Sequence, residues 1–178
     1  MKTFIALLRG INVGGNNPIP MKRLYSLCGD MGWHDVQSYI QSGNLVFTAD
    51  GTAAVLEKKL EQLIEKQFGF SIQVIVRAAA DWPAYVKSNP FPAAAKKEPN
   101  LVMLGLSKAP PKSDAVKLLR ERAANGERIE QTGDAIWVHF KKGVAGSKLS
   151  PALFDRLAGS PVTMRNWRTV LKLEELTE

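Results

Sequence analysis

Residues 9–20 read Arg-Gly-Ile-Asn-Val-Gly-Gly-Asn-Asn-Pro-Ile-Pro. This segment follows the apolar run Phe4 to Leu8 and precedes a helix-like run, Met21 to Met31. A strand, a glycine-rich loop and a helix N-terminus can bind an anion, because free N–H groups and the helix dipole point at one place. The segment is no P-loop, since no Gly-Lys-Ser/Thr follows the glycines. Its glycines, at positions 10, 14 and 15, also differ from the dinucleotide-binding pattern.

The elements around this segment have the order βαββαβ. Apolar periodicity predicts strands over residues 3–8, 36–41, 44–48 and 71–77, and helices over residues 21–31 and 52–68. Ser42-Gly43 is typical of a tight turn between two strands, and Gly69 of a helix end. This order is that of a split-βαβ, ferredoxin-like unit.

The same order recurs further along the chain. Strands are expected over residues 101–106, 128–131, 134–140 and 162–165, and helices over residues 110–124, 150–158 and 166–176. Gln41-Ser42-Gly43-Asn44 recurs as Gln131-Thr132-Gly133-Asp134, and Val74–Arg77 recurs as Val162–Arg165. The offsets nearly agree, at 90 (131 against 41) and 88 (165 against 77), which indicates an internal duplication.

We therefore predict an α+β protein made of two ferredoxin-like βαββαβ halves, residues 1–77 and 101–178, packed together and ending in a C-terminal helix. Residues 78–100 would connect them. Within this connector we expect a short helix around Trp82 to Lys87, and no regular structure from Asn89 to Pro92. Phe91 stands between two prolines, and we expect an apolar pocket to hold it.

Composition and charge limit the kinds of partner. The chain has 178 residues and a net charge of +7, of which residues 90–178 contribute +5 (15 Lys/Arg against 10 Asp/Glu). A basic balance favours acidic partners such as phosphates, nucleotides or nucleic acid, but the simpler explanation of a charge of this size is a solubilising surface. No apolar run approaches the ~20 residues of a membrane span. Cys28 is the only cysteine, which excludes an internal disulfide and fits a reducing cytoplasm.

The first candidate site lies where the glycine-rich loop meets the first hairpin. In a βαββαβ unit the end of the first strand and the hairpin tip lie at one edge of the sheet. The residues expected there are Arg9, Asn12, Gly14 and Gly15 from the loop and Ser42, Gly43 and Asn44 from the hairpin. A cation, flexible amides, a hydroxyl and a carboxamide suit a phosphate or another anion. The alternative is a structural loop whose asparagines satisfy its own turns.

A second candidate is a basic patch in the second half. It comprises Lys148, Arg165 and Arg168, with Trp137 and Trp167 as possible stacking surfaces for a base. The alternatives are a solvated basic edge and core tryptophans. No metal or cofactor site is expected, because His34 and His139 match no ligand spacing. Cys28 lies on the apolar side of a helix and is expected in the core.

Several motifs together resemble the bacterial family called domain of unknown function 1697. The motifs are Ala6–Gly15, Tyr39–Asn44, Asn89-Pro90-Phe91, Ser147-Lys148-Leu149 and Thr163–Leu173. In the usual pattern a second threonine stands where this chain has Met164, a departure that affects no functional residue. The resemblance implies an α+β fold and a bacterial, cytoplasmic protein. It implies no known reaction, so no catalytic residue is carried over.

Three functions are compatible with these residues. The first is a binding module for an anionic ligand, which would be a phosphorylated small molecule, a nucleotide or nucleic acid. The second is an enzyme acting on a phosphorylated or nucleotide substrate, with Arg9 or Lys148 neutralising charge, although no base, nucleophile or metal set is evident. The third is a scaffold or dimerisation module, which would leave an apolar sheet face exposed.

Overall fold

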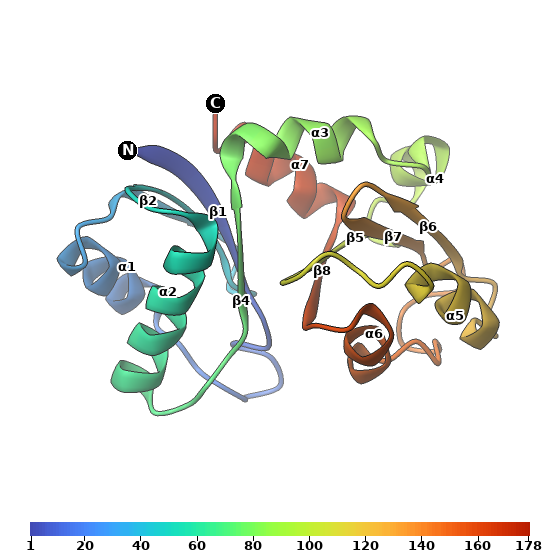
Figure 1. Cartoon of the computed structure of the whole chain (residues 1–178), viewed down its shortest axis with the longest axis horizontal. Coiled ribbons are helices and arrows are strands. Elements are labelled where there is room, and N and C mark those ends of the chain that lie inside the picture. Colours follow the sequence, from blue (N-terminus) through green and yellow to red (C-terminus); the bar gives the residue numbers. More distant parts are fainter. The chain divides into compact units, whose positions relative to one another are not determined.

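The computed structural model describes all residues, 1–178, and divides them into two compact units (Figure 1). The first unit comprises Met1–Pro83 and Lys172–Glu178, and the second comprises Ala84–Leu171. Each unit contains one four-stranded sheet and its own helices. The expected α+β fold with two halves is therefore confirmed.

The first unit contains the predicted βαββαβ order. Its elements are β1 (Lys2–Leu8), α1 (Met21–Asp30), β2 (His34–Tyr39), β3 (Asn44–Ala49), α2 (Ala53–Phe68) and β4 (Val74–Ala78). The sheet has the strand order β2-β3-β1-β4, and every neighbouring pair is antiparallel. The crossover helices α1 and α2 lie on the same side of this sheet (Figure 1).

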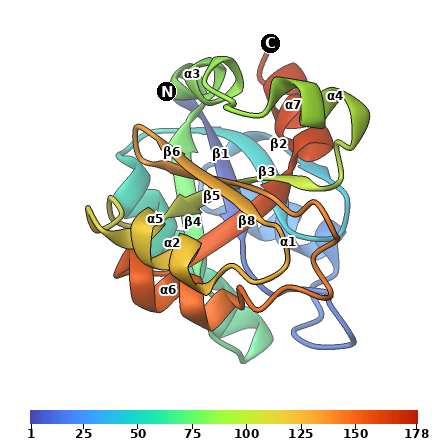
Figure 2. The ribbon, with the colours of Figure 1, turned by 90° about the vertical axis from the view of Figure 1, so that its right-hand side faces the viewer.

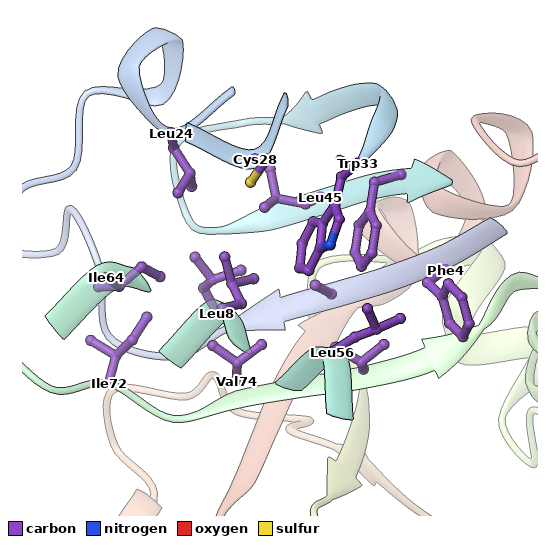
Figure 3. Close-up of a cluster of buried hydrophobic side chains, with 14 of the residues drawn as sticks. Phe4, Leu8, Leu24, Cys28, Trp33, Leu45, Leu56, Ile64, Ile72 and Val74 are labelled. Atoms are coloured by element: carbon purple, nitrogen blue, oxygen red, sulfur yellow. The ribbon is translucent and has the colours of Figure 1, made fainter. Parts of the chain in front are cut away.

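Alternating apolar residues of β1 and the apolar stripes of the two helices form the core of the first unit (Figure 3). Phe4, Ala6 and Leu8 of β1 are buried among side chains of α1, β3, α2 and β4. Trp33, which follows α1, stacks on Phe47 with the ring centroids 4.1 Å apart. Cys28 is a member of this cluster, and burial raises the pKa of its thiol to about 12. The cysteine is therefore a core residue, as predicted.

The second unit repeats the pattern. Its sheet contains β5 (Val102–Ser107), β6 (Arg128–Thr132), β7 (Ala135–His139) and β8 (Val162–Asn166) in the antiparallel order β6-β7-β5-β8. The helices α5 (Ala115–Arg122) and α6 (Pro151–Ala158) lie side by side and pack on this sheet (Figure 2). The helix α7 (Trp167–Glu175) follows β8, and its residues up to Leu171 belong to the second unit.

Strand register supports the internal repeat residue by residue. Arg77 lies opposite Ile5 in the first sheet, and Arg165 lies opposite Leu104 in the second. Both guanidinium groups donate to the carbonyl of the preceding residue, at 3.0 Å and 2.8 Å. The two hairpins differ, however: four residues (40–43) join β2 to β3, whereas two (133–134) join β6 to β7. Gly43 and Gly133 therefore lie in corresponding hairpins with different local settings.

The connector contains more helix than the sequence analysis predicted. The 3-10 turn Ala79–Asp81 leads into α3 (Trp82–Lys87), which confirms the expected short helix. Asn89 to Phe91 has no regular structure, as expected, but Pro92 begins a further helix, α4 (Pro92–Lys97). Proline suits the first position of a helix, and the Ala-Lys-rich sequence after it favours helix strongly. Phe91 is buried, as predicted, with the Arg128 guanidinium 4.8 Å from its ring centroid.

The predicted start of the helix at residue 110 is wrong, because α5 begins at Ala115. Residues 108–112 are bound instead to the segment between α6 and β8. The backbone amide of Lys108 donates to Pro161, and that of Lys112 donates to Ala158. These long-range hydrogen bonds hold the two prolines in a non-helical conformation.

Ser150 caps α6, and its removal provides a test of the local structure. The Ser150 hydroxyl accepts a hydrogen bond from the Leu153 amide at 3.2 Å. Ser150→Ala should lower the free energy of unfolding by about 1 kcal/mol, whereas Ser150→Gly should cost only a few tenths, roughly, since glycine also suits this position. Denaturant unfolding of both variants measures the difference. Equal losses in the two variants would contradict a capping role.

Candidate functional site

The tip of the glycine-rich loop, residues 9–20, is a tight turn at residues 13–16. Val13 and Asn16 form an isolated antiparallel bridge, and the Asn16 amide donates to the Val13 carbonyl at 2.9 Å. The central residues Gly14 and Gly15 have φ of 57° and 76°, the positive values that a type I′ turn requires. Residues 13–16 are exposed, and the N–H groups of Gly14 and Gly15 make no hydrogen bond within the protein.

Two asparagines hold the base of this loop. The Asn12 side chain accepts a hydrogen bond from the Ile19 amide at 2.8 Å and donates to the Ile19 carbonyl at 3.2 Å. The Asn17 side chain donates to the Gly10 carbonyl at 3.0 Å. Both asparagines have positive φ, which asparagine tolerates better than most residues. Asn12 therefore has the structural role that the sequence analysis gave as the alternative.

The loop and the first hairpin are joined directly. The Asn12 side chain donates to the Gln41 carbonyl at 2.9 Å, and the Leu8 amide donates to the Gly43 carbonyl at 2.7 Å. Asn44 is fully buried, and its side chain donates to the Tyr39 carbonyl and to the Ser42 hydroxyl. The hairpin asparagine is thus also used internally.

Arg9 and Ser42 complete the predicted site, and both are half-buried. The Arg9 backbone amide donates to the Gln73 carbonyl at 3.0 Å, which fixes the start of the loop against the segment before β4. Of the seven predicted residues, Gly14 and Gly15 present exposed backbone amides that make no hydrogen bond within the protein, whereas Arg9, Ser42 and Asn44 make interactions within it.

The three residues of the second candidate, the basic patch, lie on three different segments of the second unit. Arg165 lies on β8, where its guanidinium donates to the Thr163 hydroxyl and the Met164 carbonyl, and burial lowers its pKa to about 10. Lys148 is exposed on the loop before α6, and Arg168 lines a groove with residues of α3 and α4. Trp137 is fully buried, in agreement with the core alternative.

Other features of the structure bear on possible sites. No group of three or more His, Cys, Asp or Glu side chains is placed to hold a metal ion. None of the helices combines the length and the apolarity needed to cross a membrane. The groove beside Arg168 was missed by sequence reasoning, because its residues come from two segments, 86–99 and 167–171, that are distant in the chain.

Comparison with known proteins assigns the family. The family model described as "Protein of unknown function (DUF1697)" matches residues 1–137, which is more than half of the chain. The chain belongs to the DUF1697 family. No curated protein matches it significantly. Among solved structures it is similar to "conserved bacterial protein SP0830 from Streptococcus pneumoniae", with 24% identity, 99% of each chain covered and a TM-score of 0.71. At that identity the likeness to SP0830 shows a shared fold alone.

Proposed function

We propose that this DUF1697 protein is a binding module for an anionic ligand, held at the tip of residues 9–20. The ligand would be a phosphate-bearing molecule. It would accept hydrogen bonds from the amides of Gly14 and Gly15 and face the positive charge of Arg9. The observation that carries the proposal is the pair of exposed amides without acceptors at the tip of a firmly held loop.

The internal repeat supports the proposal, because it shows what the topology alone requires. In the second unit, residues 108–114 suffice to connect β5 to α5, whereas the first unit uses residues 9–20 between β1 and α1. The shorter connection contains two prolines and no glycine. The additional length and the glycines of the first unit are therefore not needed to complete a βαββαβ fold.

Backbone conformation gives a second line of support. φ is positive at Gly10, Asn12 and Gly14 and negative at the two residues between them. The Asn12 hydrogen bonds hold this conformation without a ligand, so little conformational entropy would be lost on binding.

Replacement of Arg9 tests the proposal. Thermal unfolding would be followed in the presence of inorganic phosphate and of pyrophosphate. A ligand at 100 times its dissociation constant stabilises the folded protein by about 2.7 kcal/mol. We expect Arg9→Ala to lose most of this stabilisation, because a charge-assisted contact is removed, while the melting temperature without ligand changes little.

The matched control is Lys22→Ala, which removes one positive charge from an exposed position of α1 in the same unit. This variant should keep the full stabilisation by pyrophosphate. Equal losses in both variants would mean that net charge alone causes the effect. Unfolding of Arg9→Ala without ligand would identify the arginine as a structural tie for the loop. Either result would contradict the proposal.

A further inference from the structure

A groove of about 490 Å³ lies on the second unit, and all of its lining residues belong to that unit. None of them comes from the loop of residues 9–20. Residues of α3, α4 and the start of α7 line it. Three of them are cationic, Lys87, Lys96 and Arg168, and no carboxylate is among the lining residues. These cations are exposed and make no salt bridge. The remaining lining is mostly apolar, so an anionic group would meet positive charge without competition from acidic side chains.

Asn89, which lines the groove, has a buried hydrogen-bond donor without a partner. Its Oδ1 atom accepts a hydrogen bond from the Phe91 amide at 2.8 Å, which fixes the orientation of the carboxamide, because an N–H group requires an acceptor. Its Nδ2 atom is buried and makes no hydrogen bond. A buried donor without a partner is unusual in a folded protein and is often explained by a ligand or an ordered water. Asn89 lines the groove, so an acceptor bound there would satisfy it.

Trp167 adds a flat apolar surface. Its ring contacts that of the fully buried Trp137, with the centroids 5.9 Å apart, and its backbone amide donates to the Pro99 carbonyl at 3.1 Å. The Trp137 indole is itself held by a hydrogen bond to the Thr132 hydroxyl at 3.0 Å. Trp167 is therefore fixed in place, and its half-buried ring also lines the groove. Aromatic rings held in this way are common stacking surfaces for nucleobases.

From these observations we infer that the groove is a second ligand site, which takes a small aromatic phosphate of mononucleotide size. The phosphate would lie near Arg168 and Lys96, an acceptor atom would meet Asn89 Nδ2, and the flat ring would stack on Trp167. A volume of about 490 Å³ is within the usual range for small-molecule sites. This inference is independent of the site at residues 9–20, because no residue is shared.

Isothermal titration calorimetry with adenosine 5′-monophosphate tests the inference on the full chain. We expect saturable binding at low salt. Adenosine, which lacks the phosphate, and inorganic phosphate, which lacks the ring, should each bind at least about tenfold more weakly. Binding of adenosine with the affinity of the nucleotide would overturn the role of the cations, and the absence of saturable binding by the nucleotide would overturn the site.

Three variants locate the binding. Arg168→Gln and Trp167→Leu should each weaken nucleotide binding about tenfold, by loss of a charge-assisted contact and of stacking. Asn89→Asp keeps the acceptor for the Phe91 amide but replaces the donor with an anionic oxygen, so binding should fall by about tenfold or more. If Asn89→Asp fails to fold, the exposed Arg168→Gln still decides the question.

Two controls separate this groove from other positive surfaces. Lys117→Gln removes a positive charge from an exposed position of α5 in the same unit and should leave the affinity unchanged. Arg9→Ala disturbs only the site proposed at residues 9–20, so the part of nucleotide binding that depends on Arg168 and Trp167 should remain in this variant, which distinguishes the two sites. Nucleotide binding that is lost in Arg9→Ala and kept in Arg168→Gln would assign the ligand to the loop and overturn this inference.

Discussion

Replacement of Gly43 with alanine should destabilise the protein by about 3 kcal/mol, the largest loss expected from any single change considered for this loop and hairpin. A Cβ atom at Gly43 would lie 2.8 Å from the Leu8 Cβ atom and 2.9 Å from the Leu8 carbonyl oxygen. Backbone would have to move to relieve the second contact, because the carbonyl belongs to β1. The φ of 89° adds the strain of a left-handed conformation.

Gly133→Ala is the matched control for this change. Gly133 lies in the corresponding hairpin and has φ of 59°, but a Cβ atom there would have no heavy atom within 4 Å. Only the left-handed penalty remains, so the loss should be about 1 kcal/mol. Urea unfolding of the two variants measures the contrast. Equal destabilisation would show that the contact with Leu8 is not the reason for a glycine at position 43.

Asn12→Ala should have the second largest effect, a loss of about 2–3 kcal/mol. The variant loses the donor to Ile19 and to Gln41 and leaves the Ile19 amide without its acceptor. Ile19 is only 3% exposed, so water cannot readily replace that acceptor. Alanine also tolerates the φ of 53° less well than asparagine.

Asn16→Ala is the control for this asparagine. Asn16 is exposed, its side chain makes no hydrogen bond, and its φ is not positive. Its replacement should change stability by less than about 0.5 kcal/mol. Chemical denaturation compares the two variants, and pyrophosphate titration of Asn12→Ala should show weaker binding, because the loop tip is no longer preorganised. An Asn12→Ala protein as stable as Asn16→Ala would mean that the loop is held by other contacts.

Much of the fold could be predicted from the sequence because its signals are local. Thr52 and Gly69 bound α2 as expected, and the Gly69 φ of 79° is the left-handed helix end that glycine favours. The duplication was visible in two short repeats whose offsets, 90 and 88, nearly agree. Helix α4, which the sequence analysis missed, also had a local signal, since Pro92 and the alanines after it suit a helix start. The several prolines of this segment favoured a connector without helix, and that signal outweighed it.

The site could be predicted only in part, because the use of a polar side chain depends on neighbours that are distant in sequence. The meeting of the loop with the hairpin follows from βαββαβ topology. The bonding of Asn12 to Gln41 does not, and an asparagine in a glycine-rich loop looks the same whether it binds a ligand or the backbone. The groove on the second unit was invisible for the same reason, since Asn89 and Trp167 are far apart in the sequence.

The amides at the tip of residues 9–20 are the proposed anion site, and nuclear magnetic resonance observes those amides directly. Pyrophosphate would be titrated into the ¹⁵N-labelled protein while the amide signals of Gly14, Gly15 and Gly133 are followed. We expect the signals of Gly14 and Gly15 to shift saturably and that of Gly133 to stay in place, and we expect Arg9→Ala to abolish the shifts. Unmoved signals of Gly14 and Gly15 at saturating pyrophosphate would contradict the account and leave the loop with a structural role alone.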